Sequence, residues 1–562
     1  PYTPPVLSHH RRRHRRRKME DNSHRFVGWP QQPPEVAELL SQMQGLRTKA
    51  TELFLREEWH ESIQVYSILI KLCLDHISNA GEDEEREELA KYKRCLCLAL
   101  SNRAEARSRL GDCDEALRDC DQALVIEGTH FKSLLCKGRI LLGLNRYSKA
   151  LNCFKTALLD PQGNGNLESL TGYVEKCKRL ELQSRTGAFD LSDWVLNGFR
   201  GKCPELAEYV GPIEIKSSEL SGRGLFTTKD VEVGTLMLVA KAVAIERGIL
   251  SSEDPNDTDG QLVMWRNFVE KIMESATKCP RIHHLISTLS EGKGEDQLEV
   301  PEISLFDAEA RDGGWRDDKV DKDRILSILD VNSLVEDSAS AKVLGRNSDY
   351  YGVGLWLLAS FVNHSCNPNA RRLHVGDYIL VIASRDVKAG EEITFAYFDV
   401  LTPLQKRKQM SKPWGFCCRC KRCRVEEGLF TKQGFDEIEL RINRGLDLGG
   451  AVLKLEEGMK KWMVTGKAKG YLRASFWDAY SKVYSLDRTV MRRIPAAETV
   501  VDSIIEATGS DERVLRVVVE RLKKNKVGGV MEMERAMKLG KGVYGKAIKK
   551  QAMRSLLGIR IH

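Results

Sequence analysis

The sequence predicts an α+β protein of several domains, with all-α regions at both ends and a β-rich region between them. Three observations support this architecture. A pattern of apolar residues repeats at a fixed interval in the first third of the chain, Gly and β-branched residues become frequent over 205–250, and helical spacing of apolar residues returns after 426. At 562 residues the chain has room for three or four domains, each with a core of its own.

The N-terminal repeat has a period of 34 residues. The second and third copies align Ala104, Ala116, Cys120 and Ala123 with Gly138, Ala150, Phe154 and Ala157, and a weaker first copy has Ala50, Ser62, Tyr66 and Leu69. The period resembles that of the tetratricopeptide (TPR) repeat, in which pairs of helices stack into an array. We therefore expect a three-repeat array over 35–190, with the charged stretch 82–88 forming a long loop or helix extensions.

The central and C-terminal regions differ in their periodicity. Residues 205–250 predict strands separated by turns, and two later segments, Tyr378–Ala383 and Glu392–Tyr397, predict further strands. Between them, 250–350 is irregular and partly acidic, and we expect an insertion with some helix near Trp265–Ile272. Amphipathic helices are expected over 426–562, as a C-terminal all-α domain that packs on the core or binds a partner.

The most informative segment is an abrupt change from apolar to polar residues. The run LLASFV at 357–362, expected to be helical, is followed by Asn363, His364, Ser365 and Cys366 and then by NPN. Polar groups behind a buried run need hydrogen-bond partners. A bound ligand or a structural turn could each supply these partners, and the residues alone leave both readings open.

Four motifs in a fixed order resemble the SET domain of protein lysine methyltransferases. They are SGRGLF at 221–226, NHSCNPN at 363–369, GEEITFAY at 390–397 and the post-SET cysteines within 414–423. The resemblance covers roughly 210–425, within a predicted domain at 205–425, and implies a β-rich fold around a threaded, pseudo-knotted segment. It is closest to the SET-and-MYND (SMYD) family. The MYND zinc finger is missing, because 250–350 contains only Cys279, His283 and His284 as candidate ligands of that kind.

The resemblance implies S-adenosylmethionine as the cofactor. The backbone of a glycine turn is expected to lie against it, since the missing side chain permits close approach. A polar pair should hold the amino-acid end of the cofactor, and an aromatic side chain should pack near its adenine. The implied cofactor-binding residues are Arg223, Gly224, Leu225, Asn363, His364, Tyr397 and Phe416.

Tyr397 corresponds to the catalytic tyrosine beside the transferred methyl group. The methyl acceptor is a lysine amine, which must lose its proton to attack although its ordinary pKa is about 10.4. A narrow aromatic channel disfavours the charged amine by desolvation, and the tyrosine hydroxyl can hold the neutral amine in line for displacement. We therefore expect a protein-lysine N-methyltransferase. The alternative is an inactive TPR–SET adaptor that only binds protein partners.

A cluster of cysteines follows the tyrosine. Because the chain shows no export signal, Cys418, Cys420 and Cys423 favour metal ligation over a disulfide framework. The SET resemblance supplies Cys366 as a fourth ligand and implies one Zn²⁺ that closes the active site. Cys417 is the alternative ligand if the register shifts by one residue. A redox-active or surface cluster is the other reading.

The charge distribution bears on localisation and partners. The chain has 88 basic and 80 acidic residues, but seven of the basic residues lie in the tail RRRHRRRK at 11–18. The remainder is nearly neutral, so direct nucleic acid binding is not expected. The tail over 1–34 is expected to be disordered. It could be a nuclear localisation signal or precede a native start at Met19, and a nuclear or cytoplasmic location is expected. No apolar run long enough to span a membrane and no secretory signal is found.

Protein partners are expected at two places. The active site should take a protein substrate, histone or non-histone. The groove of the array should bind other proteins, with chaperone C-terminal tails as one candidate, because Arg47, Asn102 and Lys132 match the carboxylate-clamp positions of some TPR arrays. Thr51 and Cys136 depart from that pattern.

Overall fold

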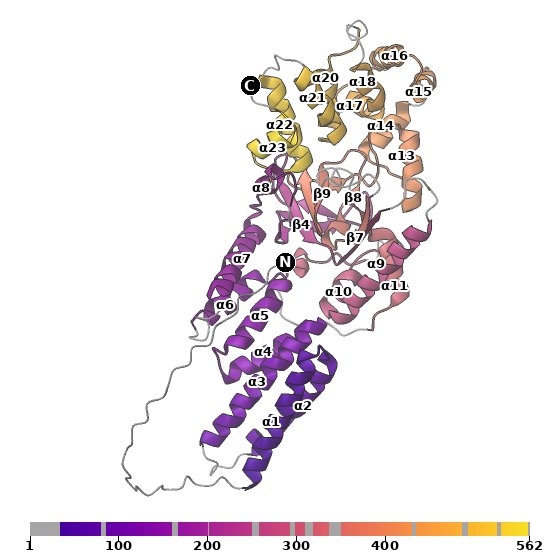
Figure 1. The fold of residues 1–562 in the computed structure, drawn as a ribbon. Coiled ribbons are helices and arrows are strands. Elements are labelled where there is room, and N and C mark those ends of the chain that lie inside the picture. The colour runs from indigo at the N-terminus through magenta and orange to yellow at the C-terminus, as the bar shows by residue number, and fades with distance from the viewer. Residues whose placement is uncertain are drawn as a thin grey trace.

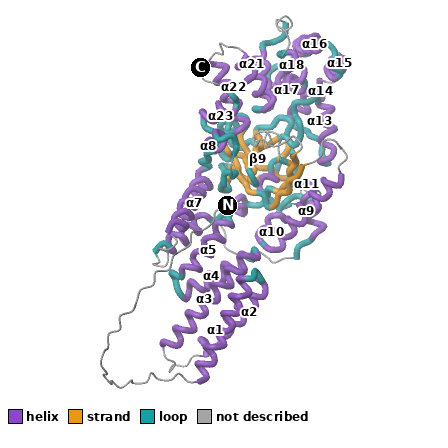
Figure 2. The backbone as a smooth tube through the Cα atoms, viewed as in Figure 1, coloured by secondary structure: helices purple, strands orange, loops and turns teal. Residues whose placement is uncertain are grey.

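The computed structural model describes residues 34–79, 86–159, 167–200, 202–249, 258–292, 298–309, 319–336, 350–429, 434–485, 493–524 and 530–559. The basic tail and the first part of the charged stretch at 82–88 lie outside these residues. An elongated helical array leads into a β-rich centre, which is capped by a second group of helices (Figure 1). Figure 2 shows that the strands are confined to this centre. Among the described helices, none has the length and apolar character needed to cross a bilayer.

The repeat array consists of helices that each pack on the next along the chain. The predicted register is confirmed, because the aligned small and large positions of all three copies are buried. Two equivalent helices begin 34 residues apart, at Cys113 and Tyr147. A Cβ on Gly138 would lie 2.7 Å from the ring of Phe154, so the close helix crossing requires glycine. The helices are α1 (Pro34–Leu55), α2 (Trp59–Asn79), α3 (Arg86–Leu110), α4 (Cys113–Ile126), α5 (Phe131–Gly143), α6 (Tyr147–Ala157) and α7 (Leu167–Thr186), followed by α8 (Ser192–Leu196).

Within the described residues, the β-rich centre forms four small sheets. The largest has the strand order β1-β4-β10-β9 with antiparallel neighbours, and the others are β5-β7-β6, the hairpin β2-β3 and the parallel pair β8-β11. The strands are β1 (Tyr209–Val210), β2 (Ile213–Ser217), β3 (Arg223–Thr227), β4 (Leu236–Lys241), β5 (Ala244–Ile249), β6 (Leu334–Val335), β7 (Tyr350–Leu355), β8 (Asn363–His364), β9 (Ala370–Val375), β10 (Tyr378–Ala383) and β11 (Thr394–Phe395). β10 has the predicted bounds, whereas β11 covers only two of the six residues predicted there.

Strand β10 explains why YILVIA is apolar throughout. Leu380 and Ile382 pack into a core shared with the C-terminal helices, whereas Ile379 and Val381 pack into a second core with the insertion helices. Alternate side chains of a strand point to opposite faces of its sheet, so a strand covered on both faces reads as a continuous apolar run.

The insertion between the two halves of the β region is more helical than we expected. Helix α9 (Thr258–Lys278) is much longer than the segment predicted from the sequence and contacts β5 and β7. On its buried face, Met264, Phe268, Ile272 and Ala276 are spaced four residues apart, and Val269 lies beside them. The many charged residues on its other face hid this period in the sequence. The described insertion also contains helices α10 (Pro280–Ser287) and α11 (Lys322–Asn332), the 3₁₀ turn η3 (Ile303–Phe306) and strand β6.

The C-terminal helices share a core with the main sheet. Helix α22 contacts β9 and β10, and α23 returns to α8 near the start of the β region. An ion pair of 2.8 Å between Arg371 on β9 and Asp511 also connects the sheet to these helices. The helices are α13 (Leu404–Ser411), α14 (Lys421–Leu429), α15 (Phe435–Asn443), α16 (Leu448–Lys461), α17 (Lys467–Ser475), α18 (Trp477–Val483), α20 (Ala497–Thr508), α21 (Glu512–Lys524), α22 (Val530–Tyr544) and α23 (Lys550–Leu556).

The apolar run before Asn363 is a 3₁₀ turn, η4 (Leu358–Phe361), rather than the expected helix. From this turn the chain enters β8, which pairs in parallel with β11. β8 and β11 belong to segments about 30 residues apart, so the parallel pairing brings the NHSC and GEEITF motifs side by side.

Candidate active site and metal centre

Tyr397 is held against the NHSC segment by two hydrogen bonds. Its hydroxyl donates to the carbonyl oxygen of Val362 at 2.9 Å. Its backbone N–H donates to Nδ1 of His364 at 3.0 Å. Because one bond fixes the backbone and the other fixes the end of the side chain, the phenol has little freedom to reorient.

His364 connects Tyr397 to the cysteine cluster. Since Nδ1 accepts a hydrogen bond, the neutral imidazole carries its proton on Nε2. Nε2 lies 3.4 Å from Sγ of Cys366 and donates to that sulfur. The imidazole also stacks on Phe398, with ring centroids 4.3 Å apart. Loss of order at the cysteine cluster would therefore be transmitted through His364 to the backbone of Tyr397.

Aromatic rings surround Tyr397. The nearest is Trp414, with ring centroids 4.9 Å apart, followed by Phe395 at 5.7 Å and Phe416 at 6.1 Å. Phe416 also lies 5.4 Å from His364. Tyr397 is thus packed among aromatic side chains, whose apolar surfaces would disfavour a charged amine beside it.

Asn363 joins the glycine turn to a half-buried carboxyl group, that of Glu392. Its side-chain N–H donors contact the carbonyl oxygens of Ser221 and Arg223, each at 3.1 Å, and a carboxylate oxygen of Glu392 at 2.8 Å. Burial raises the pKa of Glu392, although hydrogen bonds from Asn363 and Ser218 oppose that effect.

Gly224 lies where these groups meet. A Cβ on it would lie 3.0 Å from the carboxyl carbon of Glu392 and 3.3 Å from the amide nitrogen of Asn363. Leu225 is buried next to it in β3. The side chain of Arg223 points elsewhere: it donates to the carbonyl oxygens of Thr288 and Glu299 in the insertion, at 2.8 and 3.0 Å. The prediction that Arg223 borders the cofactor therefore concerns its backbone alone and stays a prediction.

Four cysteines converge behind His364. The sulfurs of Cys366, Cys418, Cys420 and Cys423 all lie within 4.8 Å of one another, and Cys366 and Cys418 are 3.9 Å apart. Tetrahedral Zn²⁺ with bonds of about 2.3 Å to sulfur needs sulfurs about 3.8 Å apart, so the donor set fits this ion. Hydrogen bonds from the Cys418, Cys420 and Cys423 thiols hold the pKa of Cys366 well below its ordinary value. Cys417 is exposed and outside the cluster.

A buried charge network underlies the cluster. Arg407 donates to Sγ of Cys423 at 3.3 Å and pairs with Glu426. Arg422 also pairs with Glu426, at 2.7 Å, and donates to the carbonyl oxygen of Cys366 at 2.9 Å. The two arginines and one glutamate leave one net positive charge beside the thiolates, which favours the negatively charged form that metal binding requires.

The structure thus brings the predicted site residues into one region. The motifs in the sequence did not single out Glu392, Phe398, Trp414 or Arg407. The first two lie inside or directly after the motif that contains Tyr397, and Trp414 lies two residues before Phe416. Their closeness to the motifs in the sequence could have marked these three residues as part of the site. The motifs alone, however, do not show which of their residues have a role in the site and which only pack in the core. Arg407 lies in a charged helix and offered no such signal.

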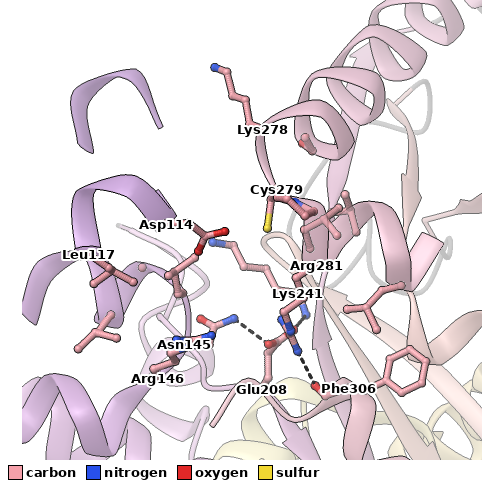
Figure 3. Close-up of a pocket in the computed structure, with 18 of the residues that line it drawn as sticks. Asp114, Leu117, Asn145, Arg146, Glu208, Lys241, Lys278, Cys279, Arg281 and Phe306 are labelled. Carbon is pink, nitrogen blue, oxygen red and sulfur yellow. Dashed lines mark hydrogen bonds between the residues drawn. The ribbon is translucent and has the colours of Figure 1, made fainter. Parts of the chain in front are cut away.

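A separate cavity of about 1340 Å³ lies between the repeat array and the β region. Its walls come from α4 to α6, β4, the end of α9 and α10, and none of the predicted site residues lines it. Arg281 on one wall donates to the carbonyl oxygen of Phe306 at 3.4 Å, and Asn145 donates to Glu208 at 2.7 Å (Figure 3).

Comparison with known proteins identifies the β-rich region. Residues 222–398 match the family model described as SET domain. This chain contains a SET domain. The match takes in the glycine turn, the NHSC segment and Tyr397 of the site. The SET domain accounts for about a third of the chain, so the flanking helical regions lie outside the matched residues.

Two relatives are methyltransferases by name. A protein of Gibberella zeae called methyltransferase is 24% identical over 81% of this chain and 63% of its own length. Histone-lysine N-methyltransferase SMYD3 of Homo sapiens is 42% identical over 14% of this chain and 18% of its own length. The chain therefore spans less than two thirds of either relative. Among solved structures, the C-terminal TPR-containing domain of a Plasmodium falciparum FK506-binding protein covers 27% of this chain and 95% of its own, at 18% identity and a TM-score of 0.24.

Proposed function

We propose that this protein transfers a methyl group from S-adenosylmethionine to a lysine side chain of a protein substrate. The observation that carries the proposal is the double anchoring of Tyr397 within a SET domain. Its hydroxyl donates to the Val362 carbonyl, its backbone N–H donates to His364, and aromatic rings pack around it. The relatives with methyltransferase names are in line with this chemistry.

The residues around the glycine turn fit the cofactor. The backbone of Arg223, Gly224 and Leu225, the polar pair Asn363 and His364, and the ring of Phe416 are the groups that would hold it. When bound, S-adenosylmethionine supplies an electrophilic methyl group on a sulfonium. The same segment has an acceptor to offer a ligand, because the buried Oδ1 of Asn367 has no hydrogen-bond partner within the described structure.

Tyr397 would act on the lysine amine by orientation. Since its hydroxyl proton is directed to Val362, a lone pair of the oxygen can accept an amine N–H and fix the nitrogen in line for attack. The rings of Trp414, Phe395 and Phe416 exclude water and favour the neutral amine. The proton lost by the lysine leaves to solvent before the transfer.

We infer that the cysteine cluster holds one structural Zn²⁺. The ion would fix the segment after Phe416 to the NHSC segment through Cys366. Its role there would be structural, because four thiolate ligands leave no open coordination position for a substrate or water. We expect metal analysis to give about one zinc at this site, lost in Cys420→Ser.

The test of the enzyme proposal measures binding and transfer separately. Calorimetry should show that the wild-type chain binds S-adenosylmethionine, and radiolabelled methyl groups should appear on lysines of added protein. Tyr397→Phe should retain cofactor binding but lower kcat by about 100-fold, through misorientation of the amine. Tyr484→Phe is the matched control, because its hydroxyl also donates to a carbonyl oxygen, that of Pro495 at 2.9 Å. A chain that binds no cofactor would refute the proposal and leave the adaptor as the better reading.

We also propose that the repeat array binds protein partners. Arg47 and Lys132 have exposed side chains suited to a carboxylate, whereas Cys136 is buried and unable to contribute. A pull-down with a chaperone C-terminal peptide tests the narrower idea, since Lys132→Glu should abolish capture. A nuclear or cytoplasmic location is likewise proposed, and imaging of the chain with and without 11–18 tests the role of the basic tail.

A further inference from the structure

Three metal-binding side chains converge in the repeat array, far along the chain from the SET domain. Sγ of Cys97, a carboxylate oxygen of Glu127 and an imidazole nitrogen of His130 lie within 4.8 Å of one another. They come from α3, from the residue that ends α4 and from the residue that begins α5. The Cys97 sulfur and the Glu127 carboxylate are 4.0 Å apart.

We propose that Cys97, Glu127 and His130 bind a Zn²⁺ ion. One thiolate, one imidazole and one carboxylate are the three ligand types that zinc takes in proteins, and a water molecule can complete the tetrahedron on the exposed Glu127 side. With bonds of about 2.3 Å to sulfur and 2.0 Å to oxygen, these two atoms would be about 3.5 Å apart. The observed 4.0 Å therefore needs closure by only half an ångström. A rotation of the exposed carboxylate provides it.

The charge around the three residues favours a cation. In the described part of the chain no lysine or arginine forms an ion pair with Glu127. Cys97 is buried, and its thiol donates to the carbonyl oxygen of Ala123 at 3.5 Å. Within the described residues no lysine or arginine neutralises this carboxylate beside the buried thiol, and a divalent ion would supply positive charge there. Binding replaces the thiol proton with the metal, and the proton leaves to solvent.

The position of the site gives it a structural role. Cys97 belongs to the second repeat and His130 to the third, and Glu127 lies in the turn that joins them. His130 also begins α5 as its N-cap, with Nδ1 accepting from the backbone N–H of Ser133 at 3.4 Å. A metal bound here would link the two repeats, because one ion would fix the turn to the preceding helix. The array would then be more stable with zinc than without it.

The experiment counts zinc in the full chain. After saturation with ZnSO₄ and removal of loosely bound metal, we expect about two zinc ions per wild-type chain and about one in Cys97→Ser. Cys97→Ser should lower the count by one in the Cys420→Ser background as well, which separates this site from the SET cluster. Cys177→Ser is the matched control, because Cys177 is equally buried in the same array but outside the site. An unchanged count in Cys97→Ser would overturn the proposal.

A second set of variants tests the site in case Cys97→Ser, a change at a buried residue, prevents folding. Glu127→Gln changes an exposed residue, and His130→Asn keeps a side-chain acceptor for the N-cap. Each should weaken zinc binding by more than about tenfold and abolish the rise in thermal stability that zinc gives the array. In the Co²⁺-substituted protein, the thiolate charge-transfer band of the one-thiolate site should vanish in Cys97→Ser. Wild-type zinc affinity in both Glu127→Gln and His130→Asn would refute the assignment, whatever the methyltransferase activity of the chain.

Discussion

Replacing Arg407 with methionine tests the link between the buried charge network and the SET-domain zinc site. Met nearly preserves the volume of this fully buried side chain. The change removes the hydrogen bond of 3.3 Å to Cys423 and the hydrogen bond of 2.9 Å to the Thr402 carbonyl. It also removes one of the two arginine partners of Glu426. Arg422 still neutralises Glu426, so the fold should survive.

The expected loss of zinc affinity follows from the loss of the hydrogen bond that Arg407 donates to Cys423. A hydrogen bond from a charged group contributes about 1.5–3 kcal/mol, which corresponds to a factor of about 10–100 in the dissociation constant. Changes just outside a metal's ligands typically cost the same factor. We therefore expect zinc affinity at Cys366, Cys418, Cys420 and Cys423 to fall by about 10- to 100-fold in Arg407→Met.

The assay is a competition titration against a coloured zinc chelator, run in the Cys97→Ser background so that only the SET-domain site responds. Lys408→Met is the control, because it removes the same charge one residue later, at a partly exposed position paired with Glu427. The control should change the affinity by less than about threefold, since exposed ion pairs contribute at most about 1 kcal/mol. Equal affinities for both variants and the wild type would refute the idea that Arg407 supports the metal site.

Three further predictions concern other parts of the chain. Gly224→Ala should destabilise the SET domain by about 1–3 kcal/mol, because its Cβ would press on Glu392, and calorimetry should find cofactor binding lost. Phe154→Ala should destabilise the repeat array by about 3–5 kcal/mol, measured by hydrogen exchange, with cofactor binding unchanged. Burial opposes ionisation of Asp511, but Arg371 and a neighbouring arginine lower its pKa below 3.8. Wild-type stability should therefore fall as the pH drops below about 4, and an acid melting series should show a smaller loss in Asp511→Asn.

The sequence predicted correctly those parts of the fold whose structure follows from the pattern of residues along the chain. The 34-residue spacing fixed which positions of the array are buried, because each repeat presents the same face to the next. The continuous apolar run of β10 indicated a strand, and its two covered faces explain the absence of alternation. The motif order likewise predicted the SET domain found over 222–398.

The errors have physical causes. The run before Asn363 was expected to be a helix, but the chain must turn there to enter β8 beside β11, and a 3₁₀ turn achieves this in four residues. The insertion was expected to be largely irregular, yet α9 has a narrow buried stripe beneath a heavily charged surface. In both places tertiary contacts decided the structure, and the local composition carried little of that information.

The sequence by itself determined the types of residue at the site and their order. The tertiary structure decided how they connect: His364 joins Tyr397 to Cys366, Arg407 supports Cys423, and Glu392 closes on Gly224. It also brought Cys97 together with two residues some thirty positions later. The physical reason is that hydrogen bonds and metal ligation act over a few ångströms of space, whereas sequence patterns report which residues lie on a common face of one element.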